Sequence, residues 1–183
     1  MRRKCSRLAG VSGRGRNYRY VGPVELKTAV RPGDGGCRIG SAADFGGWIV
    51  EQSAAELAEP FTFVVGRDGV LRLAPRRSEH VACAGGDMVL SAGEISFMRE
   101  ADRWAVGEIS NQSTGYCPDV TSWSAVARAL DGVQLGRPSG FTHEVVFRRC
   151  PDCQEHNIVR EDDFVCVFCD SDLPAAWNVD PTA

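Results

Sequence analysis

Four cysteines near the C-terminus of this 183-residue chain form two Cys-x-x-Cys motifs, Cys150-Pro-Asp-Cys153 and Cys166-Val-Phe-Cys169, separated by twelve residues. A Cys-x-x-Cys turn brings two sulfurs to one side of a tight loop, and two such turns can supply the four thiolates of a tetrahedral Zn²⁺ site. The protein would then fill every coordination position and leave none for water or substrate. The spacing therefore predicts a structural metal site. Four thiolates also bind iron, so the residue types leave zinc and iron both open.

The residues between the two motifs have the pattern of a short hairpin. Residues 157–160 and 163–167 are typical of two strands joined by the polar turn Glu161-Asp162. Through the four cysteines and Pro151, residues 148–173 resemble the rubredoxin-like and zinc-ribbon class of modules. The resemblance implies a structural Zn²⁺ held by Cys150, Cys153, Cys166 and Cys169. The alternative is two disulfides or four separate thiols, which a reducing setting and this spacing disfavour.

Zinc knuckles of this kind often have glycine directly after the second cysteine, where the backbone φ angle tends to be positive. This chain has Gln154 and Asp170 at those two positions. Aspartate tolerates a positive φ better than glutamine does. The first motif therefore departs further from the usual pattern than the second.

Two loops contain the remaining residues whose types could support catalysis. Residues 78–87 include His80 and Cys83, and residues 111–118 include Cys117. A thiol-enzyme hypothesis makes Cys83 or Cys117 the nucleophile and His80 the base, because a neighbouring base converts a weak thiol into a thiolate. Glu94 or Asn111 would orient the base. A second metal site built from His80, Cys83 and Cys117 is a further alternative, although these residues lack the knuckle spacing.

The loop 111–118 is also the first candidate for ligand binding. It is polar, rich in hydrogen-bond donors, and ends at a proline before an expected helix N-terminus. Such a loop can bind a phosphate or a carboxylate through hydroxyl and backbone N–H groups. The predicted ligand-binding residues are Asn111, Ser113, Thr114 and Tyr116.

Composition is that of a soluble globular protein, with 43% hydrophobic and 25% charged residues. We expect one main domain with a small appendage. There is no apolar run of about 18 residues and no apolar stretch after the basic N-terminus. The sequence therefore predicts a cytoplasmic protein, in which disulfides among its eight cysteines are disfavoured. The signatures of the common nucleotide hydrolases and zinc peptidases are absent from the sequence.

Charge is distributed unevenly along the chain. Residues 1–38 contain ten basic residues and two acidic ones, whereas residues 150–183 contain eight acidic residues and one arginine, Arg160. A nucleic-acid-binding module needs cations that face phosphate groups. The acidic ribbon is therefore predicted to contact protein or to be purely structural.

The basic head is the part of the chain whose residues suit RNA. Residues 14–20 interleave arginines with Tyr18 and Tyr20. Arginine neutralises phosphate and tyrosine stacks on bases, so residues 1–38 could bind RNA or single strands. The alternatives are a flexible solvated tail, and a segment that docks on an acidic surface of its own chain or of a second copy.

The rest of the chain predicts helices at either end of a run of strands. Ser41 to Asp44 is a capping pattern that starts a helix ending before Pro60. Strands are expected at 61–66, 70–74, 87–91, 93–98 and 104–110. A second helix follows Asp119 or Thr121 and ends near Gly132, and residues 141–149 return as a strand that leads into the first cysteine motif.

The predicted class is α+β, a mainly antiparallel sheet with two helices followed by a small C-terminal zinc ribbon. The expected divisions are a basic head at 1–38, a core at 39–147, and an acidic zinc ribbon and tail at 148–183. Residues 79–97 and 111–123 resemble bacterial proteins of unassigned function, which implies no activity. The favoured interpretation is a binding or adaptor protein for a protein partner or a small polar ligand. The thiol enzyme and the RNA-binding accessory protein are its alternatives.

Overall fold

The computed structural model describes residues 15–180. The first fourteen residues of the basic head, and residues 181–183 of the tail, lie outside the described residues. Five strands form an antiparallel sheet in the order β1-β3-β2-β4-β5. Their bounds are β1 Cys37–Ile39, β2 Phe61–Gly66, β3 Leu71–Ala74, β4 Val89–Glu100 and β5 Arg103–Ser110. With helices packed on this sheet, the mixed α+β class predicted from the sequence is confirmed.

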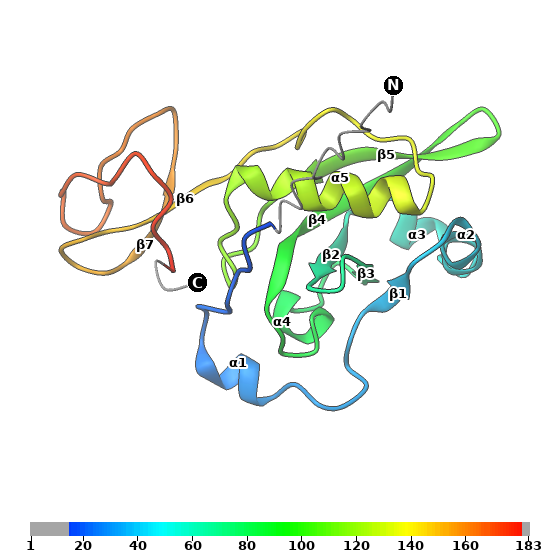
Figure 1. The fold of residues 1–183 in the computed structure, drawn as a ribbon, viewed down its shortest axis with the longest axis horizontal. Helices are drawn as coiled ribbons and strands as arrows, with labels where there is room; N and C mark the ends of the chain where they lie inside the picture. The colour runs from blue at the N-terminus through cyan, green and yellow to red at the C-terminus, as the bar shows by residue number, and fades with distance from the viewer. Residues whose placement is uncertain (1–14, 181–183) are drawn as a thin grey trace, which may run out of the picture.

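Helices cover both faces of the sheet. The two longest, α2 (Ala42–Val50) and α5 (Trp123–Gly132), pack on one face, which α5 crosses in Figure 1. The short helix α4 (His80–Cys83) packs on the other face, next to α1 (Val24–Thr28). A further short helix, α3 (Ala54–Leu57), follows α2, and the 3₁₀ turn Val120–Ser122 leads into α5. No helix in residues 15–180 combines the length and the apolar character needed to cross a membrane.

The alternation of side chains along β2 builds two separate cores. Phe61, Phe63 and Val65 point into the main core beneath α2 and α5, whereas Val64 points into the core that Val81 of α4 closes. This is the period of two expected of a strand. All of β2 is buried, because both of its faces are covered.

The predicted helix from Ser41 toward Pro60 is two helices. The chain leaves α2 after Val50, and Ser53 starts α3 with a complete capping box in which the Glu56 carboxylate accepts the Ser53 N–H at 2.8 Å. A second N-cap inside an apolar pattern ends one helix and begins another.

The two strands predicted at 87–91 and 93–98 are one strand, β4. Gly93 lies inside it, and a Cβ atom at this position would collide with the carbonyl of Ser110 on β5. The glycine therefore marks a close approach of two strands and not a turn.

A C-terminal lobe, residues 146–173, stands beside the sheet (Figure 1). Its regular structure is a second antiparallel sheet of β6 (Val146–Arg149) and β7 (His156–Val159). The sequence predicts residues 163–167 as the strand partner of residues 157–160, but β7 pairs with β6. The reason is that the first cysteine motif itself connects β6 to β7 as a hairpin. Arg160, directly after β7, forms an isolated bridge with Asp163 of the later segment.

The described part of the basic head packs against the core. Tyr18 is buried, and its backbone exchanges hydrogen bonds of 2.7 and 3.0 Å with Val89 of β4. Farther on, β1 extends the sheet across position 38, where the sequence analysis divides head from core. Residues 15–38 are therefore continuous with the sheet in this structure.

Candidate metal centre

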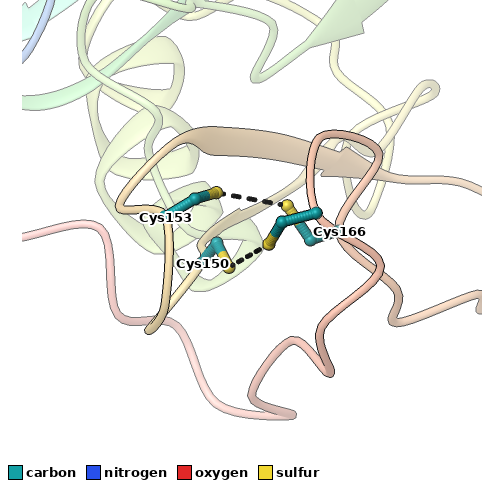
Figure 2. A group of neighbouring side chains, drawn as sticks. Cys150, Cys153 and Cys166 are labelled. Carbon is teal, nitrogen blue, oxygen red and sulfur yellow. Dashed lines mark hydrogen bonds between the residues drawn. The ribbon is translucent and has the colours of Figure 1, made fainter.

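The four cysteines of the C-terminal lobe come together in space. Cys150 and Cys153 lie in the connection between β6 and β7, and Cys166 and Cys169 lie in the loop that follows β7. All four sulfurs lie within 4.8 Å of one another. Figure 2 shows the side chains of Cys153 and Cys166 facing each other across the cluster. Among the described residues, this is the only group of histidines, cysteines and carboxylates close enough to hold a metal ion.

The spacing of the sulfurs fits a tetrahedral ion. The Sγ atoms of Cys150 and Cys169 are 3.6 Å apart, and so are those of Cys153 and Cys166. A tetrahedron with metal–sulfur bonds of about 2.3 Å has sulfur–sulfur edges of about 3.8 Å. Each of these close pairs joins one cysteine of each motif, so an ion would link the two motifs. The cluster therefore suits one metal ion with four protein ligands.

The two motifs have the same backbone hydrogen bonds although they lie in different connections. In the first, the Cys150 N–H donates to the carbonyl of Glu155 at 2.9 Å, and the Gln154 N–H donates to the carbonyl of Cys150 at 3.1 Å. In the second, Cys166, Asp170 and Ser171 repeat this pattern at 2.8 and 2.9 Å. The two Cys-x-x-Cys motifs therefore have the same backbone turn.

The residue after each second cysteine has a positive φ angle. Gln154 has φ of 66° and Asp170 has φ of 60°. Both lie in the left-handed region that glycine occupies most readily. The two positions thus have the conformation expected of zinc knuckles, and the first motif holds it with a glutamine.

Hydrogen-bond donors surround the sulfurs of the second motif. Burial disfavours the Cys166 thiolate, but the backbone N–H groups of Phe168 and Cys169 donate to it, and together with its other polar neighbours they lower its pKa to about 6. The hydroxyl and backbone N–H of Ser171 lower the pKa of Cys169. These donors stabilise negative charge on sulfur, which is the state that binds metal.

The first motif shows why the cluster needs a cation. The Glu155 backbone N–H favours the Cys153 thiolate, yet burial and hydrogen bonds with the three neighbouring sulfurs raise the pKa of Cys153 to about 12. Four thiolates within 4.8 Å repel one another unless a positive ion lies between them. A divalent ion removes this conflict and allows all four cysteines to ionise.

Asn157 joins the two motifs and is the residue that the sequence analysis missed. Its side chain is 2% exposed, accepts the Val167 N–H at 3.0 Å, and donates to the Glu155 carbonyl at 3.0 Å and to Cys166 Sγ at 3.5 Å. Residues that hold metal ligands in this way orient them and adjust their basicity. The sequence signal that could have indicated this role is an asparagine between the two motifs, at the start of the predicted strand 157–160.

A C-terminal strap, residues 174–180, fastens the lobe to the core. Buried Arg148 of β6 donates to the carbonyls of Phe147, Pro174 and Ala175 at 2.7, 2.9 and 2.6 Å. Asn178 exchanges hydrogen bonds of 2.8 and 2.6 Å with the Arg149 backbone, directly before the first motif.

The strap continues onto the core next to the loop 111–118. Trp177 donates from its indole N–H to the Cys117 carbonyl at 2.8 Å, and its ring meets that of Tyr18 edge-on at 5.4 Å. Val179 is buried against Cys117 and Phe147. The metal centre is thus tied to the sheet through β6 and through the strap.

The candidate nucleophiles Cys83 and Cys117 are buried thiols in two different hydrophobic clusters. Burial raises the pKa of each to about 12. His80, the candidate base, is held by the Gly93 carbonyl 3.0 Å from its Nε2 atom, and burial lowers its pKa. Both thiols therefore stay protonated at neutral pH. Buried, protonated cysteines of this kind are unreactive.

Glu94 lies close enough to His80 for its charge to favour the protonated imidazole, which partly opposes the effect of burial on the His80 pKa. Glu94 lines an open pocket of about 250 Å³ with Glu108 of the neighbouring strand and with His143. Neither Cys83 nor Cys117 lines this pocket.

The loop 111–118 satisfies most of its polar groups internally. The Asn111 side chain donates to the carbonyls of Pro118 and Val145 at 2.9 and 2.8 Å and accepts the Val145 N–H at 2.7 Å. Tyr116 donates its hydroxyl to the Asp87 carbonyl at 2.7 Å. The Ser113 hydroxyl is buried and has no hydrogen-bond partner among the described residues, whereas Thr114 is exposed. Along the chain this loop connects β5 to the 3₁₀ turn before α5, and through Asn111 it is hydrogen-bonded to Val145, directly before β6.

Comparison with known proteins finds no matching family model, no matching curated protein and no matching solved structure.

Proposed function

We propose that this protein is a binding or adaptor module whose C-terminal lobe holds a structural zinc ion and whose partner is another protein. The observation that carries the zinc proposal is the closed set of four sulfurs within 4.8 Å of one another, with the same turn at both motifs. When bound, the ion would cross-link β6, β7 and the loop after them. Four thiolates leave no open coordination position, so the ion would stabilise the lobe and would not act on a substrate.

The burial of the two core thiols, Cys83 and Cys117, favours protein binding over thiol catalysis. Cys83 and Cys117 are buried, their pKa values are raised to about 12, and they belong to separate clusters. A nucleophile needs a thiolate and access to substrate. Neither condition is met in this arrangement.

A small polar ligand at the loop 111–118 receives less support than a protein partner. The Asn111 amide and the Tyr116 hydroxyl, two of its four candidate contacts, are engaged within the fold. RNA contact through the head rests mainly on its arginines, because Tyr18 is buried against Trp177 and Tyr20 packs edge-on against Tyr116. A cytoplasmic, reducing setting would keep the four metal-binding thiols available.

The test measures which proteins are recovered with three tagged forms of the full chain from cells of its source: the wild type, a core-thiol double variant and a metal-ligand variant. We expect a protein partner to be recovered with the wild type and with the double variant Cys83→Ser, Cys117→Ser, and to be lost with Cys166→Ser. Recovery that does not depend on Cys166 would contradict a role for the metal centre. An activity that disappears in the double variant while its metal content stays normal would establish the thiol enzyme instead.

A further inference from the structure

The second cysteine motif exposes an apolar surface. Val165, Val167 and Phe168 are 39%, 75% and 62% exposed. They make up three of the seven large exposed hydrophobic residues in the described part of the chain, and all three lie within four positions. The second motif lies in the outer part of the C-terminal lobe, away from the main sheet (Figure 1). We call residues 161–172 the second-motif face.

The knuckle geometry does not require apolar residues at these positions. The two residues between the cysteines point outward because both sulfurs turn inward. In the first motif the same positions hold Pro151 and Asp152, which are also exposed. Because both motifs share the same backbone hydrogen bonds, a polar residue fits this turn. Exposing Val167 and Phe168 instead forgoes hydrophobic stabilisation, which indicates that these side chains are covered in a complex.

A rim of acidic residues accompanies the apolar side chains. The second-motif face carries five exposed carboxylates, and Asp172 is bridged across the backbone to Val165. Arg160, directly before the face, is the only lysine or arginine from residue 150 to the end of the chain. The five acidic residues are Glu161, Asp162, Asp163, Asp170 and Asp172.

Two of these acidic residues, Glu161 and Asp162, occupy a turn whose backbone conformation favours asparagine and glycine. Glu161 and Asp162 have φ angles of 51° and 58°, and the Asp163 N–H closes the turn on the Arg160 carbonyl at 2.9 Å. Two successive positive φ angles define the hairpin turn in which Asn-Gly is preferred. A non-glycine residue in this conformation costs roughly 1–2 kcal/mol. The chain therefore keeps two negative charges where Asn-Gly would be more stable.

We propose that the second-motif face is the docking surface for a separate protein that presents an apolar side chain surrounded by lysine or arginine. This inference rests on the proposed function and names its surface and the chemistry of its partner. The apolar centre and charged rim match the usual anatomy of a protein interface. Charge complementarity selects a basic partner, because an acidic rim repels nucleic acid and would repel the same face of a second copy.

The test places a photoreactive side chain at the centre of the face. The full-length, metal-loaded protein carries Phe168→benzoylphenylalanine and is irradiated in cells of its source, and Val50→benzoylphenylalanine on α2 is the control because Val50 is 78% exposed. We expect position 168, and not position 50, to cross-link a separate protein at a segment containing several lysines or arginines. A cross-link to residues 1–14, to a second copy or to an acidic segment would overturn the inference.

Binding of the captured protein, once purified, provides the quantitative test. We expect Phe168→Ser to weaken binding by about tenfold or more, as removal of a central aromatic residue does. Changing the five acidic residues to their amides should weaken binding similarly and reduce its dependence on salt. The double variant Glu161→Asn, Asp162→Gly should bind more weakly while its lobe becomes more stable, which separates charge from folding. Binding unchanged in all three variants would overturn the inference.

A parallel experiment separates failure of this inference from failure of the proposed function. The wild-type protein is treated with a general lysine-reactive cross-linker under the same conditions. A partner captured in that way but not from position 168 leaves the proposed function standing and places docking on another surface. No partner by either route contradicts both.

Discussion

The cysteines of the sheet domain and those of the C-terminal lobe have the same side chain in opposite environments. Cys83 and Cys117 lie singly in apolar clusters, and burial raises the pKa of each to about 12. In the lobe, four sulfurs lie within 4.8 Å. N–H donors bring the pKa of Cys166 to about 6 in spite of burial, whereas burial and the neighbouring sulfurs raise that of Cys153 to about 12. Grouping and hydrogen-bond donors thus decide which cysteines can bind metal.

The two regions also differ in how they are held together. The main core buries residues from α2, α5 and all five strands of the sheet, and it contains six large aromatic side chains. The lobe's own cluster contains Cys150, Cys166 and Leu173 as its buried members. So small an apolar cluster offsets little of the conformational entropy of the lobe, and we propose that a bound ion supplies most of its folding free energy.

Removing one ligand should therefore have the largest effect, and it should be confined to the lobe. In Cys166→Ser we expect the metal to be lost and the lobe to unfold, because metal binding supplies roughly 10–16 kcal/mol in small zinc modules. Amide hydrogen exchange should show protection lost in residues 146–173 and kept in β2 and β4. Cys37→Ser, at an exposed thiol outside the cluster, is the control and should retain the metal. Loss of protection throughout the sheet would show that the core also depends on the ion.

The next prediction concerns thiol reactivity in the native, metal-loaded protein. At pH 8 a thiol with a pKa of about 12 is thiolate in only about one molecule in 10⁴. We expect iodoacetamide to label exposed Cys37 at least about tenfold faster than Cys83 or Cys117, as measured by mass spectrometry of peptides, although partial burial also raises the pKa of Cys37. After chelation the four lobe cysteines should become reactive while the two core thiols stay protected. Rapid labelling of Cys83 or Cys117 would remove the contrast between the two regions.

A smaller effect is expected where the two regions join. Arg148→Met removes hydrogen bonds to three carbonyls and leaves these groups without their partner, which should lower the free energy of unfolding by about 2–4 kcal/mol. Denaturant titration measures this loss, and limited proteolysis should cut the freed strap. Arg149→Met is the matched control, because the Arg149 guanidinium makes one exposed hydrogen bond at 3.3 Å, to the Gln154 carbonyl. Equal losses in the two variants would contradict the role given to Arg148.

The smallest expected effect is on metal affinity, and it should differ between two buried asparagines, Asn157 and Asn111. Asn157→Ala should weaken metal affinity about 10–100-fold, because it removes the side chain that links both motifs. Asn111→Ala loses a comparable set of hydrogen bonds within the core, so it should lower core stability and leave metal affinity unchanged. Competition with a metal-binding dye measures both affinities. A similar loss of affinity in both variants would mean that Asn157 acts through general stability.

The features that sequence predicted well are those set by neighbouring residues. The Cys-x-x-Cys spacing, the neighbouring strands β2 and β3, and the Ser41 N-cap all depend on a few adjacent positions. The hydrophobic pattern also placed α5, whose buried residues follow the period of a helix.

What the sequence did not reveal depends on contacts between distant residues. Arg148 finds its carbonyl partners 26 and 27 residues later in the chain. For Asn111 the sequence predicts ligand binding but could not show that its amide is hydrogen-bonded to Pro118 and Val145, because a bonded asparagine and a ligand-binding one have the same local pattern. The break expected between residues 91 and 93 was wrong for the same reason, since only the approach of β5 explains the glycine at position 93.

The most direct test of the account is the metal content and coordination of the freshly purified full-length protein. Elemental analysis should find one zinc ion per chain, and X-ray absorption at the zinc edge should show four sulfur ligands at about 2.3 Å. A protein that folds without a stoichiometric metal, or whose ion has nitrogen or oxygen ligands, would contradict the central claim.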